Sequence, residues 1–161
     1  MNPIVRRADI SDIPLLVDLT DEIQALHAKA HPNLFIYPQD RSVLSRHFAE
    51  VMASDANHIL LLEVDGRVDG HLYAEIRRIP ATPFGYPNAC LFIHQLGVRA
   101  GARSRGLGQK LLAAASDIAR SNGLSEIRLD YWSFNEPARR FYAKNGFRVF
   151  REFVSKRLAS E

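Results

Sequence analysis

The sequence predicts a single α/β (α+β) domain spanning residues 1–161, in which helices pack on a mixed central β-sheet. Three observations point to this class. Two strand-like runs flank an Asp65-Gly66 hairpin signal, an apolar run of central-strand type covers 89–98, and an amphipathic helical pattern covers 106–121. With 161 residues, 47% of them hydrophobic, the chain is long enough to bury a sizeable core.

The first part of the chain is predicted to form a short strand, two helices and an antiparallel strand pair. Ser11 or Asp12 can cap the first helix, Pro14 falls in its tolerated first turn, and His31-Pro32 ends it. Apolar residues recur at helical spacing, which predicts a buried stripe on each helix. The expected spans are 4–8 for the first strand, 41–53 for the second helix, and 58–64 and 67–79 for the strand pair, with helix stripes of Leu15, Leu16, Leu19, Ile23 and Leu26 and of Val43, Leu44, Phe48 and Val51.

The second part is predicted to alternate strands and helices. Pro and Gly residues mark a loop at 80–87, before the central strand. The helix that follows the central strand ends at the stop signal Asn122-Gly123. The remaining features are a helix stripe of Leu107, Leu111, Leu112, Ala115 and Ile118, a strand at 126–131, a helix at 135–145 with Pro137 in its first turn, and a last strand at 147–158.

Composition excludes several classes of protein. No apolar run approaches the ~20 residues of a membrane span, and the first residues lack a signal-peptide core, so we expect a soluble, cytoplasmic protein without a membrane partner. The single cysteine, Cys90, has no internal disulfide partner and lies in an apolar strand pattern, which favours a packing role. The formal net charge of +3 is too small to indicate a nucleic-acid partner.

Charge is distributed unevenly along the chain. Residues 1–98 carry 8 Lys/Arg and 12 Asp/Glu, a net charge of −4, whereas residues 99–161 carry 13 and 6, a net charge of +7. One interpretation is an ordinary solvated surface. The other is a basic part for an anionic cofactor beside an acidic part for a cationic substrate.

The motif Arg103-Ser104-Arg105-Gly106-Leu107-Gly108 lies where the central strand turns into a helix. Glycine lets the backbone approach an anion, the N–H groups of a first helical turn point at it, and the arginines add positive charge. A nucleoside triphosphatase loop is disfavoured because Lys-Ser/Thr does not follow the glycines. A dinucleotide-binding loop is disfavoured because Leu111 stands where its third glycine belongs.

This Arg-x-x-Gly-x-Gly motif, the preceding Gln95-Leu96-Gly97-Val98 and the downstream segment 135–147 together resemble the GCN5-related N-acetyltransferase (GNAT) family. The resemblance covers the second half from about Ala89, and the first half agrees more loosely. It implies a sheet splayed after its fourth strand, with acetyl-CoA as cosubstrate. The backbone of 103–108 would cradle the CoA pyrophosphate, and Leu96, Gly97 and Val98 would hold the pantetheine arm and face the thioester oxygen. Gly97 suits a local splay or bulge.

Two downstream residues match further family positions. Asn135 matches an asparagine beside the pantetheine and thiol, and it can cap its helix at the same time, because capping uses only the side-chain oxygen. Tyr142 matches a tyrosine near the CoA sulfur, where a phenol could protonate the leaving thiolate. Its neighbour Phe141 is then expected to be the core aromatic.

A general base is needed because an amine with a lysine-like pKa of ~10.4 is mostly protonated at neutral pH. Strand alternation predicts that His94 and Phe92 share a face with Leu96 and Val98. Phe92 stands where the family often carries glutamate, so His94 is the first candidate and Glu75 on the preceding strand is the second. A hydrogen-bonded core role for His94 is the alternative.

The resemblance predicts acetyl transfer to an amine by direct attack in a ternary complex. We expect a primary amine of a small molecule, cationic if the charge distribution is functional; a protein Lys or N-terminus and a non-catalytic CoA-binding module are the alternatives. The aromatic loops 32–38 and 83–87 could form substrate walls or merely anchor themselves. His27 and His31 lack further ligands, so no metal is expected. A homodimer is compatible with the sequence.

Overall fold

The computed structural model describes residues 2–158, which fall into two compact units divided between Asp130 and Tyr131. The second unit contains helix α4 (Glu136–Lys144). The first unit contains strands β1 (Ile4–Arg7), β2 (Asn57–Val64), β3 (Arg67–Ile79), β4 (Asn88–Val98) and β5 (Ile127–Leu129), helices α1 (Ile13–Ala30), α2 (Arg41–Met52) and α3 (Leu107–Ser121), and 3-10 turns at Ile10–Asp12 and Ala100–Ala102.

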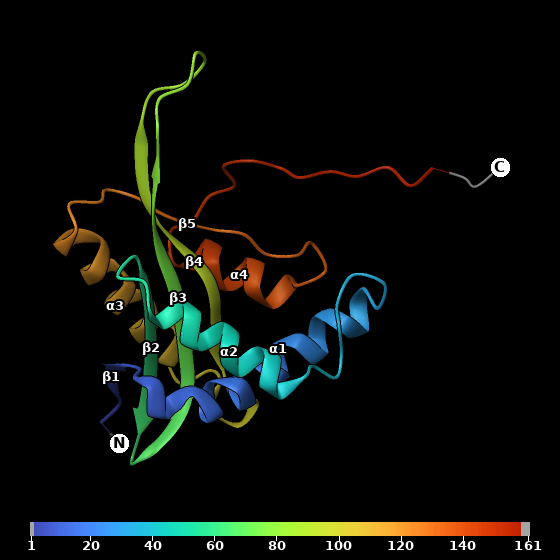
Figure 1. The fold of residues 1–161 in the computed structure, drawn as a ribbon, viewed down its shortest axis with the longest axis vertical. Coiled ribbons are helices and arrows are strands. Elements are labelled where there is room, and N and C mark those ends of the chain that lie inside the picture. Colours follow the sequence, from blue (N-terminus) through green and yellow to red (C-terminus); the bar gives the residue numbers. More distant parts are fainter. Residues whose placement is uncertain (1, 159–161) are drawn as a thin grey trace. The chain divides into compact units, whose positions relative to one another are not determined.

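The sheet is mixed, as predicted, and its five strands lie in the order β1-β2-β3-β4-β5 (Figure 1). Neighbouring strands are antiparallel except β4 and β5, which are parallel. β5 pairs with β4 only from Leu91 to Ile93. Within residues 2–158, no strand therefore pairs with the β5-side edge of 94–98, and the sheet opens after its fourth strand.

Helices cover both faces of the sheet, with α1 and α2 on one face and α3 on the other (Figure 1). Two glycines show how closely they pack: a Cβ on Gly97 would lie 2.8 Å from Ile23 Cδ1 of α1, and a Cβ on Gly70 would lie 3.4 Å from Leu111 Cδ1 of α3. The core on the α1 side includes Leu16 and Phe48, both almost fully buried. Burial of such apolar side chains is the main stabilising contribution.

Details of the predicted helices needed correction. Asp12 occupies the N-cap position of α1, as one of the two predicted candidates, but its side chain makes no capping hydrogen bond to that helix. Its carboxylate instead accepts hydrogen bonds from Arg6 at 2.7 and 2.8 Å, and Asp9 caps the preceding 3-10 turn. Leu26 and Val43 are 46% and 52% exposed, so they are not part of the buried stripes. Periodicity identifies the apolar face of a helix but not how far its packing partner extends.

The predicted last strand at 147–158 is absent, and β5 is shorter than the predicted 126–131. In 147–158 the apolar residues Val149, Phe153 and Val154 are 72–93% exposed. A β-strand requires a hydrogen-bonding partner, which an alternating sequence pattern does not identify. Across residues 2–158, no helix combines the length and apolar character that a membrane span needs.

Candidate active site

A β-bulge in β4 reorganises the face on which the predicted base lies. Tyr73 of β3 pairs with Gln95 and Ala74 pairs with Ile93, so His94 is the extra residue. Phe92 lies directly opposite Glu75, so the two side chains share one face of the sheet. His94 lies on this same face, in contact with Phe92.

The bulge makes one sequence prediction wrong. Leu96 pairs with Leu72 and Val98 pairs with Gly70, and both therefore lie on the α3 face of the sheet. Strict alternation had placed them with His94. An inserted residue shifts the period-two pattern by one position, and the amino-acid sequence gives no local signal for this insertion.

The structure brings the two candidate bases together. The Nε2 atom of His94 lies 2.8 Å from Oε2 of Glu75, which also accepts a hydrogen bond from Nε of Arg77 at 3.0 Å. The imidazole stacks on Tyr73 with ring centroids 4.5 Å apart and meets the edge of Phe92 at 5.2 Å. His94 is therefore oriented by a carboxylate and held between two aromatic rings.

Two titratable neighbours of His94, Glu75 and Tyr73, have shifted pKa values. Partial burial alone would raise the pKa of Glu75, but hydrogen bonds from His94 and Arg77 outweigh that effect and hold the pKa below its ordinary value. Burial, and then the neighbouring Glu75 charge, raise the pKa of Tyr73. Glu75 is therefore ionised and Tyr73 is a neutral phenol.

The end of β4 is crowded on its α1 side. A Cβ on Gly97 would lie 3.0 Å from Cε1 of His71, which is 1% exposed, in addition to the contact with α1. Burial lowers the pKa of His71 to about 4, so this imidazole is neutral, and its Nε2 lies 3.3 Å from Gln95 Oε1. Gly97 is thus required by close packing, and the bulge predicted for it lies at His94 instead.

The loop from Arg103 to Gly106 has the backbone geometry expected of an anion site. Ser104 and Gly106 have φ angles of 63° and 75°, and Gly106 is the N-cap of α3. Glycine has no side chain to cap the helix, which leaves the first-turn N–H groups to an external acceptor. Arg103 Nε donates to the Val98 carbonyl at 2.9 Å, which ties the loop to the end of β4. The loop also carries Arg105, and α3 opens with Leu107 and Gly108.

Arg103 has a second partner on α1. Its Nη2 atom lies 3.8 Å from a Glu22 carboxylate oxygen, and the same carboxylate lies 3.8 Å from Nη1 of Arg99. All three side chains are substantially exposed, so these contacts add little stability.

The predicted residues of the second unit have the local structure expected of them, with one exception. Asn135 is the N-cap of α4, and its side-chain oxygen accepts a hydrogen bond from Ala138 N at 3.2 Å. Tyr142 is 9% exposed, stacks on Tyr131 at 5.9 Å and meets the edge of Phe147 at 5.5 Å. It is more buried than Phe141, so the expectation that Phe141 is the core aromatic is wrong.

Comparison with known sequences decides the family. The sequence profile of the Acetyltransferase (GNAT) family matches residues 20–147, which is most of the chain. The chain belongs to the GNAT family. The matched segment includes the bulge, the loop at 103–108 and helix α4.

GNAT relatives include streptothricin acetyltransferase of Streptomyces lavendulae, which is 29% identical over 133 residues, 81% of this chain and 66% of the relative. An uncharacterized N-acetyltransferase of Lactobacillus delbrueckii subsp. lactis is 32% identical over 103 residues, 64% of this chain and 58% of the relative. The chain spans only 40–66% of the length of the curated relatives it matches.

Solved structures share the GNAT fold. A single-substitution mutant of the BH1408 protein from Bacillus halodurans has a TM-score of 0.91 and 19% identity, covering 97% of this chain and 99% of that one. AAC(6')-Iy in complex with the bisubstrate analogue CoA-S-monomethyl-acetylneamine has a TM-score of 0.78 and 16% identity, covering 99% and 100%. At these identities, the likeness establishes the fold.

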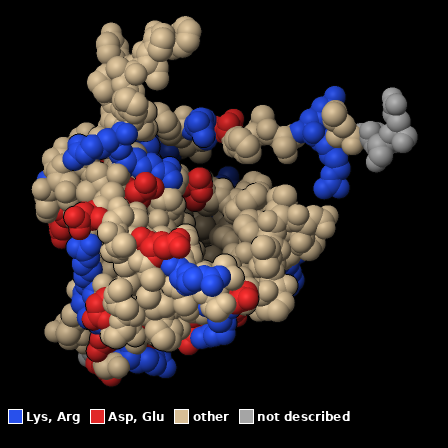
Figure 2. Space-filling view, viewed as in Figure 1, with Lys and Arg blue, Asp and Glu red and all other residues tan. Residues whose placement is uncertain are grey.

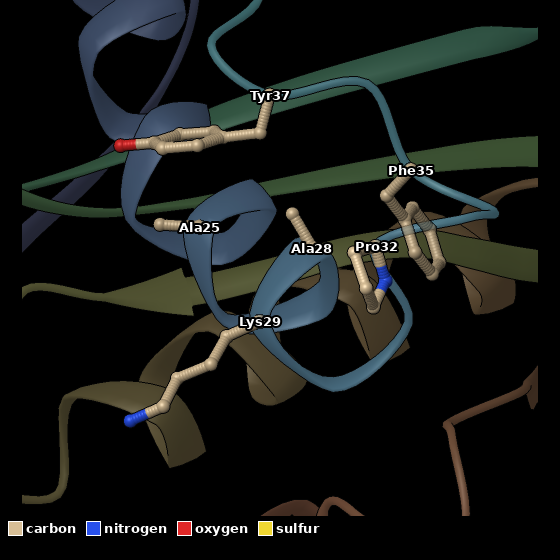
Figure 3. A pocket seen from close by; sticks show the side chains of 6 residues that line it. All are labelled: Ala25, Ala28, Lys29, Pro32, Phe35 and Tyr37. Carbon is tan, nitrogen blue, oxygen red and sulfur yellow. The ribbon is translucent and has the colours of Figure 1, made fainter.

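The two aromatic loops of this GNAT chain differ in their surroundings. Phe35 and Tyr37 line an open pocket of about 320 Å³ with Ala25, Ala28, Lys29 and Pro32 (Figure 3). At about 3.6 residues per turn, Ala25 and Ala28 lie on the side of α1 remote from Ile23, and hence away from the sheet. This pocket is therefore not beside His94.

The second aromatic loop stands at the tip of the β3–β4 hairpin, which extends beyond the rest of the sheet (Figure 1). Phe84 and Tyr86 are 99% and 93% exposed there, so they do not anchor the loop. Six residues of β4, roughly 20 Å of strand, separate the tip from His94, so a wall beside the base is not formed by this loop either.

The acidic residues of the first part of the chain do not form a single acidic face in the view shown. Acidic and basic side chains lie side by side there (Figure 2). Several acidic residues of the first part pair with nearby arginines, including Asp18 with Arg41 at 2.8 Å and Asp69 with Arg67 at 2.8 Å. Among the described residues, no three His, Cys, Asp or Glu side chains are grouped as metal ligands.

Sequence reasoning missed two residues of the cluster around His94, Tyr73 and Arg77, and also His71, which lies opposite Gly97 on the same face of β3. The sequence does contain a signal for these residues. Residues 71, 73, 75 and 77 alternate along β3 and are all polar or aromatic, so they share one face of the strand. Of these four, only Glu75 was predicted as a candidate from the sequence.

Proposed function

We propose that this chain is an acetyl-CoA-dependent N-acetyltransferase that acetylates a primary amine of a small molecule by direct attack in a ternary complex. The observation that carries the proposal is the His94–Glu75 pair, at a bulge in the strand that leads into the loop at 103–108. Family membership supports the reaction class. The two motif segments lie in different units, and we propose that 1–161 acts as a single acetyltransferase domain.

Local features of the first unit fit CoA as the donor. The loop at 103–108 offers positive-φ backbone, an uncapped helix start and two arginines, which suit a pyrophosphate. The unpaired edge of β4 along Leu96, Gly97 and Val98 suits an extended pantetheine arm, bound as an added strand. Asn135 would contribute its amide group, as the family pattern implies. Acetyl-CoA supplies a thioester whose carbonyl carbon is electrophilic.

The geometry of the pair assigns separate tasks to the two candidate bases. His94 Nε2–H donates to Glu75, which fixes the tautomer and leaves Nδ1 to accept the proton of the acceptor ammonium, directly or through water. Glu75 orients the ring and stabilises the imidazolium. Backbone N–H groups near Leu96–Val98 would stabilise the oxyanion, and Tyr142 would protonate the leaving thiolate. No covalent enzyme intermediate is required.

Small amines are the favoured acceptors because relatives and structural neighbours include a streptothricin acetyltransferase and an aminoglycoside-type enzyme bound to an acetylneamine analogue. A protein Lys or N-terminus is the second candidate. A CoA-binding module without catalysis is the third, and it would leave the His94–Glu75 pair without a task.

A mass-spectrometric screen of amine acceptors with labelled acetyl-CoA tests the proposal. The panel contains polyamines, amino sugars, aminoglycosides, amino acids and Lys-containing peptides. We expect labelled acetyl groups on small primary amines. Acetyl transfer to peptides alone would replace the small-amine assignment by a protein Lys or N-terminus. Binding of acetyl-CoA without transfer to any acceptor would leave only the non-catalytic CoA-binding module.

Donor affinity should depend on the left-handed backbone at Gly106. Alanine in that conformation costs about 1–2 kcal/mol, so in Gly106→Ala we expect the loop of the free protein to leave the left-handed conformation. Binding of the donor must then supply the free energy that restores this conformation. We expect calorimetry to show acetyl-CoA binding weakened about 5- to 30-fold. Gly101→Ala is the matched control, because Gly101 lacks positive φ and a Cβ there meets nothing within 4 Å. Equal affinity of Gly106→Ala and wild type would exclude this loop from the donor site.

A further inference from the structure

We propose that Arg77, held over the ring of Phe92, is a positioning residue that sets the orientation of Glu75 and, through it, that of the His94 ring. Its catalytic meaning rests on the proposed function, but its effect on the tautomer of His94 does not. The proposal follows from a chain of contacts that links one cation, one aromatic ring and the His94–Glu75 pair.

The contacts run through a single carboxylate oxygen. The Cζ atom of Arg77 lies 3.6 Å from the centroid of the Phe92 ring, within cation–π range. The Nε atom of the same guanidinium donates to Glu75 Oε2 at 3.0 Å, and that oxygen lies 2.8 Å from Nε2 of His94. Movement of Arg77 would therefore move the acceptor that orients His94.

Strand geometry explains why these residues meet. Phe92 lies directly opposite Glu75 in the β3–β4 ladder, and Arg77 lies two residues beyond Glu75 on the same face. A planar guanidinium can stack on a ring with its face while donating from its edge. Lysine provides the charge but not this combination.

The groups around His94 determine which ring nitrogen carries the proton of the neutral imidazole. Glu75 and Arg77 are the charged groups that contact or adjoin His94, and Tyr73 is the ring stacked on it. The Glu75 oxygen beside Nε2 favours the tautomer with the proton on Nε2. Without Arg77 this oxygen loses the donor that holds it in place, so the preference for that tautomer should weaken.

Nitrogen-15 NMR of the His94 imidazole in the free, full-length protein tests this directly, with the resonances assigned by their loss in His94→Gln. Spectra at about pH 9, well above the ordinary histidine pKa, report the tautomer of the neutral ring. We expect the Nε2–H tautomer to dominate in wild type and both tautomers to be populated in Arg77→Met. In Arg77→Lys we expect kcat to fall about 5-fold, because the charge is kept and the positioning by the planar guanidinium is lost.

Arg78→Met is the matched control, since Arg78 is exposed and points to the other face of β3, and it should leave the tautomer of His94 unchanged. An unchanged tautomer in Arg77→Met, with thermal unfolding as in wild type, would overturn the proposal. If Arg77→Met fails to fold, Arg77→Lys with wild-type kcat would overturn it. The NMR measurement requires no acetyl transfer, so its outcome is separate from that of the acceptor screen.

Discussion

Replacement of His94 by glutamine is expected to lower kcat at pH 7 by about 100- to 10,000-fold, the range for loss of a positioned general base. The acceptor ammonium then loses its proposed proton acceptor, while the carboxylate of Glu75 keeps its hydrogen bond from Arg77 Nε. The difference in kcat between wild type and His94→Gln should become smaller as the pH rises, because the fraction of unprotonated acceptor amine grows about tenfold per pH unit below a pKa of ~10.4. Steady-state kinetics between about pH 6.5 and 9.5 would measure both effects.

Two controls separate a catalytic loss from a structural one. Acetyl-CoA affinity of His94→Gln should stay within about twofold of wild type, since the loop at 103–108, which we propose binds the donor, is untouched. His47→Gln removes an exposed histidine from α2 and should retain wild-type kcat. A His94→Gln enzyme with wild-type kcat at pH 7 would exclude His94 as the base and return attention to Glu75.

Replacement of Tyr142 by phenylalanine is expected to lower kcat about 10- to 100-fold with little change in donor affinity. This is the low end of the range for general acid catalysis, because a thiol with a pKa near 8.5 leaves with modest assistance. The ring contacts with Tyr131 and Phe147 are kept, so the aromatic cluster of the second unit should survive. Kinetics at saturating donor and calorimetry with acetyl-CoA would be compared.

Tyr131→Phe is the matched control, because it removes a phenol hydroxyl from the ring stacked on Tyr142 without altering the proposed acid. It should retain wild-type kcat. Equal rate losses in both variants would indicate a packing role for the two hydroxyls, and an unaltered Tyr142→Phe rate would remove the tyrosine from the mechanism.

Local signals predicted most of the elements correctly. The long strand Arg67–Ile79 matches its predicted span, and α3 differs only in that Gly106 is its cap. These features depend on turn residues and hydrophobic period, which are properties of neighbouring residues. The predicted strand at 147–158 failed because a strand depends on a distant partner, and Tyr142 proved more buried than Phe141 because periodicity does not rank neighbours by depth.

By itself, the sequence determined the mixed fold, the positive-φ turn that leads into α3 and the family whose motif this turn carries, because turn residues and motif spacing are local properties of the chain. Only the tertiary structure decided that His94 and Glu75, the two alternative candidates for the general base, are hydrogen-bonded to each other. It also recruited Arg77 and Phe92 to the same cluster. The physical reason is one inserted residue: the bulge at His94 is set by pairing between β3 and β4, and it changes which side chains share a face.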